Sequence, residues 1–458
     1  MDRAELVRAV SDRLGEDQLV WFGTRGDDVE ALSDIPQLRA AFSLIANYGG
    51  RSRVQGLSLE DLTGARPDLD TYEIDEDPVS TEGRAALIEF RRTLLRVLAR
   101  PSAVLTYRPS AFLSAICFAR RDRCRYLGLF KDHQSAFEHK PWVETSIARV
   151  GLPAIEWTYV ADEEQLDTLR FLEEGPVMLR RSRTTGGVGL TLVEDPSRLK
   201  ELWPKEPEGY VSVARFLPDA IPVNVGAVVW HDGVTVHPAS VQLIGVDGCT
   251  ARPFGFCGND FAAAAGLGDS TLDQIERSVI AIGRWLQRFG FLGAFGVDFL
   301  VVDGVPRFTE INPRLQGSTH ASCRLSVEQD ESCLLIEHVA SNLGMDAPRS
   351  RPLRSVARDS EPLSHLVVHW LGAPAHVDGA DLVDRARRAD PGLRADVIIR
   401  PDLLVATGAT VARLTVGESI TTDGFSIYGN LRASVDEWLE DIRPEGGGPL
   451  DRGVIRLT

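Results

Sequence analysis

The chain has 458 residues, of which 43% are hydrophobic and 25% charged, which is the composition of a globular protein with several domains. Acidic residues number 66 against 50 basic ones, and the formal net charge of −16 argues against nucleic acid or an anionic membrane as partner. No stretch reaches the roughly 18 apolar residues of a membrane-spanning helix. The six cysteines show no CxxC pair, so we expect a reduced, cytoplasmic protein.

The first part of the chain alternates strand and helix patterns. Leu19–Gly23 predicts a strand, and Ala85–Arg100 predicts a helix with one apolar face. Ala103–Pro109 and Arg125–Phe130 predict two further strands. This alternation is typical of α/β structure, and we expect an N-terminal α/β domain over residues 1–130.

The middle region, residues 131–345, begins with an amphipathic helix over Trp142–Val150. Lys140 precedes this helix, and Gly151-Leu152-Pro153 ends it. Taken alone, a lysine in this position is most often a surface residue. We expect Trp142 and Trp157 to belong to the core.

A short apolar strand, Val177–Leu179, leads into Arg180 and a loop of small residues. Its glycines would allow backbone N–H groups to approach phosphate oxygens closely; they are Gly186, Gly187 and Gly189. Such a loop alone is more often an ordinary turn. It is neither a Walker A sequence nor a GxGxxG turn.

The segment Tyr210–Val236 predicts a strand, a short loop, and a second strand that ends at the Asp232-Gly233 turn. Its first strand contains Val-Ala-Arg-Phe-Leu, which could present backbone groups to the edge of a nucleotide base. Without its neighbours, this segment would be read as a plain sheet strand.

The strongest pattern lies between Gly293 and His320, where two strands flank an Asp303-Gly304 hairpin turn. Glu310 and Asn312 are two residues apart, so both project to one side of their strand. Asp298 on the partner strand can be placed beside them, and these hard oxygen ligands suit Mg²⁺. Arg314 continues the alternation and could hold phosphate oxygens or a carboxylate. A hairpin whose polar face meets water is the alternative; the added Arg314 favours the site.

The remaining residues, 346–458, predict a C-terminal α+β domain. Met345–Pro362 has three prolines and little periodicity, and we expect a linker or domain boundary there. Ser364–Gly372 and Asp396–Arg400 predict strands, and residues near 433–442 predict a closing helix. His365 is expected to be structural. The same is expected of His320, with a substrate contact as the alternative because it follows the Glu310–Asn312 motif.

These patterns, in this order and spacing, resemble the ATP-grasp superfamily of carboxylate–amine ligases, most specifically through GVDFLVVDGVPRFTEINPRLQGS. The resemblance implies an ATP-grasp fold over residues 131–345, with a flap subdomain at about 150–217, between the N-terminal α/β and C-terminal α+β domains. It implies that Lys140 and Arg180 contact ATP phosphates beneath a glycine flap, and that Arg314 stabilises the acyl phosphate. It further implies adenine contacts from Ala214, Arg215, Phe216 and Leu217, and Mg²⁺ ligands in Asp298, Glu310 and Asn312. Two positions depart from the family pattern: Ala154-Ile155 follows Pro153 in place of a second proline, and Arg180 stands where lysine is usual.

The resemblance implies an enzyme that uses ATP and Mg²⁺ to form an amide through an acyl phosphate. Its partners would be a small carboxylate, such as an amino acid, and an amine or peptide; a homodimer is the default assembly. Size and layout are similar to peptide ligases of secondary metabolism, one kind of which takes a guanidine-bearing amino acid and would need an acidic acyl pocket. The alternatives are a dipeptide-forming or primary-metabolism ligase, and a non-catalytic ATP-binding protein.

Overall fold

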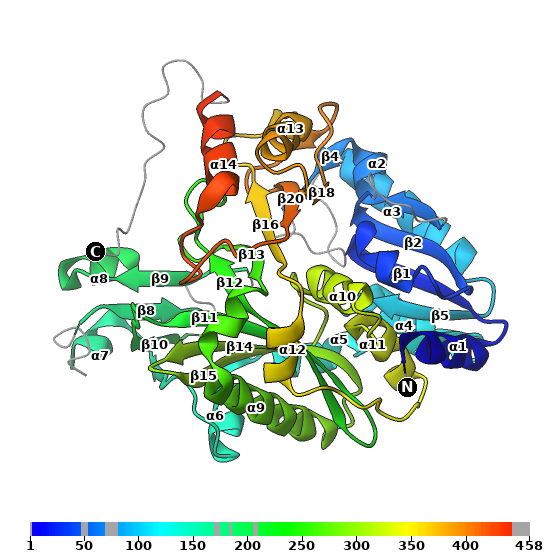
Figure 1. Cartoon of the computed structure of the whole chain (residues 1–458), viewed down its shortest axis with the longest axis horizontal. Helices are drawn as coiled ribbons and strands as arrows, with labels where there is room; N and C mark the ends of the chain where they lie inside the picture. Colours follow the sequence, from blue (N-terminus) through cyan, green and yellow to red (C-terminus); the bar gives the residue numbers. More distant parts are fainter. Residues whose placement is uncertain are drawn as a thin grey trace.

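A computed structural model describes residues 2–46, 54–68, 81–168, 175–182, 186–204 and 209–441. A parallel sheet forms one end of the molecule (Figure 1). Its strands run in the order β3-β2-β1-β5-β6 and pair only in parallel within the described residues. Their bounds are β1 Gln18–Arg25, β2 Leu38–Ile45, β3 Gln55–Ser58, β5 Ser102–Thr106 and β6 Cys124–Leu127.

Helices cover this sheet, and its strands are buried along nearly their whole length, as parallel strands with two covered faces are. The covering elements are α1 Arg3–Leu14, η1 Asp27–Leu32, α2 Leu59–Thr63, α3 Thr81–Val97 and α4 Ala111–Ala119. The three strands expected in this region and the helix near Ala85 are therefore present, although α3 begins at Thr81.

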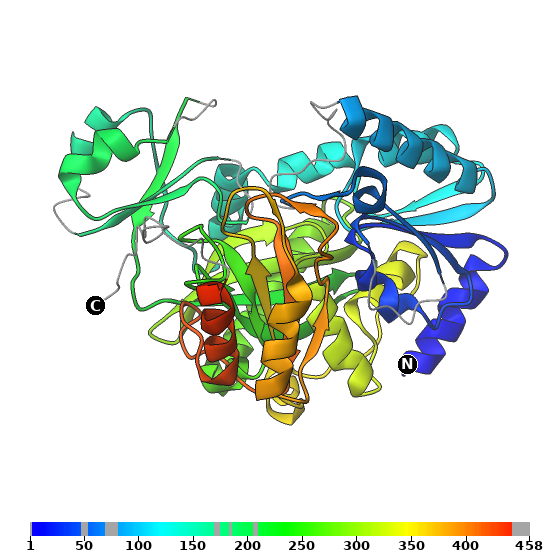
Figure 2. The ribbon, with the colours of Figure 1, turned by 90° about the horizontal axis from the view of Figure 1, so that it is seen from above.

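A small antiparallel sheet lies at the opposite end of the molecule from the N-terminal sheet (Figure 2). Its order is β7-β10-β8-β9, and short helices flank it. Two helices, α5 Lys131–Phe137 and α6 Lys140–Arg149, precede it in the chain. The bounds are β7 Thr158–Val160, α7 Glu163–Thr168, β8 Val177–Arg180, β9 Leu190–Val193, η3 Pro196–Arg198, α8 Leu199–Leu202 and β10 Val211–Arg215.

The central sheet connects the two ends. Its order in the described residues is β15-β14-β11-β12-β13-β16-β20-β18. The strands are β11 Ile221–Val229, β12 Val234–Ile244, β13 Phe256–Asp260, β14 Gly293–Val302, β15 Val305–Asn312, β16 Ser364–His369, β18 Arg394–Asp396 and β20 Thr410–Val416. The β14–β15 hairpin turns at Asp303 and Gly304, both at positive φ (51° and 74°), as the Asp-Gly signal predicts.

Helices cover both faces of the central sheet. Helix α9 (Asp269–Gln287) packs on the face that carries Val225 and Phe295, whereas α11 (Leu334–Asn342) packs with Val228 and Ala294 on the other face. The elements η4 Ala263–Leu267 and α10 Thr319–Glu328 complete this region. Residues alternate between the faces, so one stretch of strand contributes to both cores.

The C-terminal strands β16, β20 and β18 extend the central sheet, which therefore runs across the expected domain boundary at 345/346. The expected linker instead contains α12 (Leu353–Asp359), which packs on α9; a short helix buried through only Leu353 and Val356 has too little periodicity to recognise. The strand expected over Asp396–Arg400 ends at Asp396, because Val397 adopts a positive φ of 57°. Two helices, α13 Gly379–Ala389 and α14 Gly429–Asp441, close the fold.

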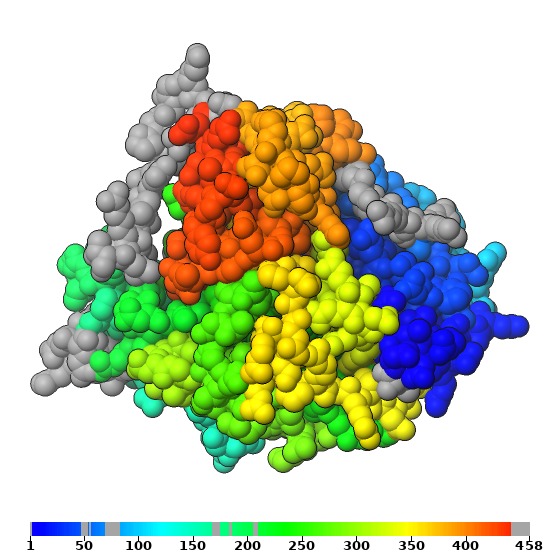
Figure 3. Space-filling view, in the orientation of Figure 1, coloured from blue at the N-terminus to red at the C-terminus, as the bar shows by residue number. Residues whose placement is uncertain are grey.

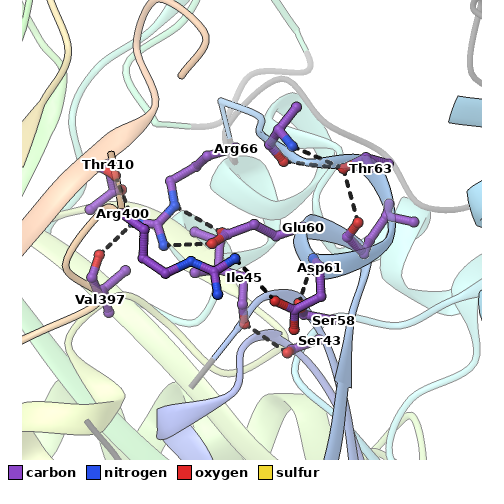
Figure 4. A network of polar contacts seen from close by, with 12 residues as sticks. Ser43, Ile45, Ser58, Glu60, Asp61, Thr63, Arg66, Val397, Arg400 and Thr410 are labelled. Atoms are coloured by element: carbon purple, nitrogen blue, oxygen red, sulfur yellow. Dashed lines mark hydrogen bonds and ion pairs between the residues drawn. The ribbon is translucent and has the colours of Figure 1, made fainter. Parts of the chain in front are cut away.

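Buried arginines join the C-terminal region to the N-terminal one. Arg66 pairs with Glu60 at 2.9 Å and donates hydrogen bonds to the carbonyls of Val397 and Thr410 (Figure 4). Arg66 belongs to β4 (Ala65–Arg66), which forms a small sheet with β19 (Leu404–Val405) and β17 (Ala375–His376). Figure 3 shows the orange C-terminal region lying against the blue N-terminal region on one face of the molecule. None of the described helices combines the length and apolarity needed to cross a bilayer.

Candidate active site

A row of polar side chains crosses one face of the central sheet. Asn224 on β11 pairs in register with Asp298 on β14, and Asp298 pairs with Glu310 on β15. Their neighbours Val225 and Val297 point the opposite way, into the core under α9. Alternation thus places the polar row on the face away from α9, and Asn312 follows Glu310 on that face.

The row is tightly hydrogen-bonded. The Asn312 Nδ2 donates to Asp298 Oδ2 (3.1 Å) and to Glu310 Oε1 (3.3 Å). Asn224 and Gln242 both donate to Asp298 Oδ1, at 2.5 and 3.2 Å. The structure therefore brings together all three residues that the sequence analysis assigned to Mg²⁺.

Electrostatics fit a cation at this row. Burial, followed by the charge of Glu310, raises the pKa of Asp298. Burial alone would raise the pKa of Glu310 too, but the charge of Lys140 and hydrogen bonds with Lys140 and Asp298 together hold that pKa low. Two carboxylates and an amide oxygen form a hard donor set, and a divalent cation would remove the repulsion between the carboxylates. The residues present fit Mg²⁺.

Two cations flank the row. Lys140, the first residue of α6, is 8% exposed and forms an ion pair with Glu310. Arg314 donates to Asn312 Oδ1 through Nη2 (3.0 Å) and lies 3.3 Å from a carboxylate oxygen of Glu138. Asp298, Glu310 and Asn312 together form the metal row. Both cationic side chains are therefore held at this row by carboxylate and amide side chains of the protein.

Arg180, at the end of β8, is buried and forms an ion pair with Glu144 of α6. Its guanidinium carbon lies 3.7 Å from the centre of the Trp157 ring, the geometry of a cation–π contact. Arg180 lines the same cavity as Lys140. Arg181 is not among the described lining residues, and Arg183 lies outside the described residues, so Arg180 is the candidate for phosphate.

The glycine loop reaches this cavity through Gly186 and Gly187. Gly187 has a φ of 76°, and a Cβ there would lie 1.9 Å from the Phe254 carbonyl oxygen, so no other residue fits. Gly189 is outside the cavity lining, and its carbonyl accepts a hydrogen bond from the Arg181 N–H (3.1 Å). Residues 183–185 of this loop lie outside the described residues.

All four residues of the expected adenine segment line the cavity, from Ala214 to Leu217. The Phe216 N–H already donates to the Pro176 carbonyl at 2.9 Å, so adenine would have to use the other backbone groups of the segment. Apolar side chains surround this end of the cavity, including Ile155, Met178 and Leu300.

The cavity has a volume of about 310 Å³ and joins the N-terminal sheet, the small sheet and the central sheet. Sequence reasoning missed several of its residues: Trp157, expected in the core, and Arg25, Tyr107, Arg108, Asn224 and Gln242. Among the described lining residues, the only carboxylates are Asp298 and Glu310. An acidic acyl pocket for a guanidine-bearing amino acid is therefore not found there.

His320 does not line the described cavity. Its Nε2 lies 3.1 Å from Asp396 Oδ2, within a buried cluster around Arg413, which matches the structural role expected for it. His365 is fully buried in the same neighbourhood.

Comparisons with known proteins bear on the fold. Residues 174–318 match a family model described as an ATP-grasp domain. No curated protein matches the chain. Similar solved structures include N5-carboxyaminoimidazole synthase from Aspergillus clavatus, in complex with ADP and 5-aminoimidazole ribonucleotide. That chain is 13% identical with a TM-score of 0.58, over 92% of this chain and 99% of that one.

Two further solved structures are similar over most of their length. N5-carboxyaminoimidazole synthetase from Staphylococcus aureus, complexed with ADP, is 13% identical, with a TM-score of 0.57 over 93% of this chain and 97% of that one. Biotin carboxylase from Campylobacter jejuni is 13% identical, with a TM-score of 0.58 over 91% and 90%. The fold is thus an ATP-grasp fold flanked by N-terminal α/β and C-terminal α+β regions, as the sequence predicts.

Proposed function

We propose that this protein is an ATP-dependent, ADP-forming ligase that joins a carboxylate to an amine through an acyl phosphate. One observation carries the proposal: Asp298, Glu310 and Asn312 form a single row in a cavity that also holds Lys140, Arg180 and Arg314. Phosphoryl transfer requires carboxylate ligands that hold a divalent cation, with positively charged side chains held beside them.

Each side chain has a role in this proposal. Asp298, Glu310 and Asn312 would hold Mg²⁺, which supplies charge neutralisation for the ATP phosphates when bound. Lys140 and Arg180 would bind phosphate oxygens, exchanging their present carboxylate partners Glu310 and Glu144 for the nucleotide. Arg314 would neutralise charge on the transferring group. The loop at Gly186–Gly187 would exclude water, which would otherwise hydrolyse the acyl phosphate.

The finer proposal concerns the substrates. An amino acid carboxylate and a peptide amine would suit the similarity in size and layout to the peptide ligase of pheganomycin biosynthesis, and would imply a role in secondary metabolism. The guanidine-bearing acyl substrate of that enzyme is not carried over, because the described cavity offers no acidic residues beyond the metal row.

A ligase of primary metabolism is the second candidate. The structural neighbours include a 2-oxoglutarate carboxylase domain in complex with MgADP and bicarbonate, and an enzyme in complex with 5-aminoimidazole ribonucleotide. By analogy, bicarbonate could serve this chain as the carboxylate. Product mass distinguishes the two candidates, because bicarbonate adds a carboxyl group and an amino acid adds its whole acyl residue.

The test is ADP release over a panel of carboxylates, including bicarbonate and amino acids, combined with amino acid, peptide and nucleotide amines. We expect Mg²⁺-dependent ADP release with one pair of substrates, and its loss in a Glu310→Ala, Asn312→Ala variant. Glu328→Gln is the control, since Glu328 pairs with Arg324 and Arg394, and none of these three residues is among the described residues that line the cavity. Undiminished turnover in the double variant would refute the metal assignment. Tight ATP binding without turnover over the whole panel would favour a non-catalytic nucleotide-binding protein.

A further inference from the structure

The N-terminal sheet contains a topological switch point beside the cavity. From β1 the chain proceeds to β2 and β3 on one side, whereas β5 and β6 lie on the other. In open parallel sheets, ligands bind in the crevice outside the carboxyl ends of the two strands where the order reverses. Here those strands are β1 and β5, which pair directly from Gln18 with Ser102 to Phe22 with Thr106.

Basic residues occupy the carboxyl ends of these two strands. Arg25 is the last residue of β1, and Tyr107 and Arg108 follow β5 directly. All three line the cavity that contains the metal row. Burial raises the pKa of the Tyr107 hydroxyl, the charge of Asp28 adds to this, and the charges of Arg25, Arg314 and Arg108 oppose it.

The carboxylates closest to Arg25 in the chain have another cation as partner. Asp27 and Asp28 follow Arg25 in the chain, but they pair with Arg413 at 2.7 and 3.2 Å. The cavity's own carboxylates belong to the metal row. Within the described residues, the half-buried Arg25 side chain has no carboxylate at ion-pair distance. A half-buried guanidinium that lines a cavity can bind a planar or tetrahedral oxyanion through charge-assisted, bidentate hydrogen bonds.

We propose that Arg25 and Arg108 form an oxyanion subsite that binds a carboxylate or phosphate group carried by one of the two substrates. As a substrate subsite it rests on the proposed ligase function. Lys140 on α6 and Arg180 on β8, the residues assigned to the ATP phosphates, belong to other elements than Arg25 and Arg108, which lie at the carboxyl ends of strands of the N-terminal sheet. The substrate concerned is then an anion: an amino acid or peptide bound by its free carboxylate, or a phosphorylated amine.

The experiment titrates inorganic phosphate and acetate, as separate probes, into the full chain saturated with Mg²⁺ and the β,γ-imido analogue of ATP. Occupying the nucleotide site first ensures that the probes do not report on it. We expect one probe to bind and Arg25→Gln to weaken its binding by about tenfold or more, the effect of losing one charge-assisted contact. Arg25→Lys should weaken it less, because the charge remains without the bidentate geometry. Phosphate as the bound probe indicates a phosphorylated substrate, and acetate indicates a carboxylate.

Arg125→Gln is the matched control: Arg125 lies on β6 of the same sheet, is exposed, and pairs with Asp17. Affinity for the ATP analogue should change less than about twofold in all variants, which also verifies folding. The proposal is overturned when neither probe binds the wild type at millimolar concentration, or when Arg25→Gln binds the probe as the wild type does. Failure of the wild type to bind the ATP analogue would instead refute the ligase function, and a titration without nucleotide would still decide the subsite.

Discussion

The guanidinium of Arg413 on β20 lies 2.7 Å from the carboxylate of Asp27, although 386 residues separate them. Both side chains are almost fully buried, and Arg413 also pairs with Asp28 and Asp396. Asp27 stands two residues beyond the end of β1. This contact therefore attaches the C-terminal region to the loop that carries Arg25, at the margin of the cavity.

Replacing Arg413 should destabilise the protein strongly. Arg413→Met removes the guanidinium that pairs with the buried Asp27 and Asp28 and with the half-buried Asp396, and we expect the free energy of unfolding to fall by about 3–5 kcal/mol. Denaturant unfolding followed by intrinsic fluorescence measures the change. Arg394→Met is the control, because the Arg394–Glu328 pair is exposed and should contribute less than about 1 kcal/mol. Equal effects of the two substitutions would contradict the assigned importance of the buried cluster.

The buried pair His237–Glu337, 3.2 Å apart, should make stability depend on pH. Burial alone would lower the pKa of His237, but the charge of Glu337 and the hydrogen bond to it, with smaller contributions from other groups, raise that pKa overall. Burial alone would raise the pKa of Glu337, yet the charge of His237 and hydrogen bonds lower it. The contribution of His237 is complete below its unfolded pKa of about 6.5 and is lost as the pH rises through the folded value. The contribution of Glu337 is complete above about 4.3 and is lost on acidification.

Thermal melting of His237→Gln and the wild type from pH 4 to pH 9 tests this pair. We expect the stability difference to be largest near pH 5–6 and to shrink toward pH 9. His231→Gln removes an exposed His231–Asp346 pair and should leave the melting profile close to that of the wild type. If the stability difference between the wild type and His237→Gln grew with pH, the predicted direction of the pH dependence would be wrong.

Lys140 should contribute to nucleotide binding. The Lys140→Met substitution removes a buried cation from the metal row, so we expect the KM for ATP to rise by about tenfold or more. Steady-state ADP release measures it. Lys200→Met is the control, since Lys200 is exposed on α8. An unchanged KM for ATP in Lys140→Met would remove Lys140 from the proposed phosphate contacts.

Arg180 should tolerate lysine better than a neutral residue. Arg180→Lys keeps the charge beside Glu144 and Trp157, whereas Arg180→Met leaves the Glu144 carboxylate buried without its cation. We expect affinity for the ATP analogue to fall by only a few-fold in Arg180→Lys and by about tenfold or more in Arg180→Met. Calorimetric titration gives both values. Equal losses would show that the guanidinium geometry, and not its charge, is what the nucleotide requires.

The metal row could be predicted because its geometry is local. The Asp303-Gly304 turn sets the register of one hairpin, and two-residue alternation then places Glu310 and Asn312 on the face of Asp298. Helix α6 and the strand before Arg180 are likewise short-range features. Their ranges were predicted to within a few residues, although Lys140 proved to be the first residue of the helix and not the residue before it.

Other cavity residues gave no local signal. Trp157 was expected in the core because an apolar side chain is usually buried, yet it lies against Arg180 in the cavity. Asn224 and Gln242 read as isolated polar residues in apolar strands, and only cross-strand pairing with β14 brings them to Asp298. The predictions of a linker before Pro362 and of a strand beyond Asp396 were wrong for similar reasons. The short helix α12 and the positive φ of Val397 both depend on the surrounding packing.

Turn chemistry and periodicity within one hairpin therefore predicted that Asp298, Glu310 and Asn312 share a face. The resemblance to the ATP-grasp superfamily implied the fold class and the residues assigned to ATP. Only the tertiary structure decided which residues of the N-terminal sheet line the same cavity as the metal row. Arg25 and Arg108 lie far apart in the chain, and the parallel pairing of β1 and β5 brings them together. Parallel pairing carries no turn or register signal that a sequence displays, because distant segments and their covering helices set it. The ion-pair cluster of Arg413 likewise depends on contacts between distant segments. Arg413, in the C-terminal region, pairs with Asp27 and Asp28, so these two aspartates have a cation other than Arg25 as partner.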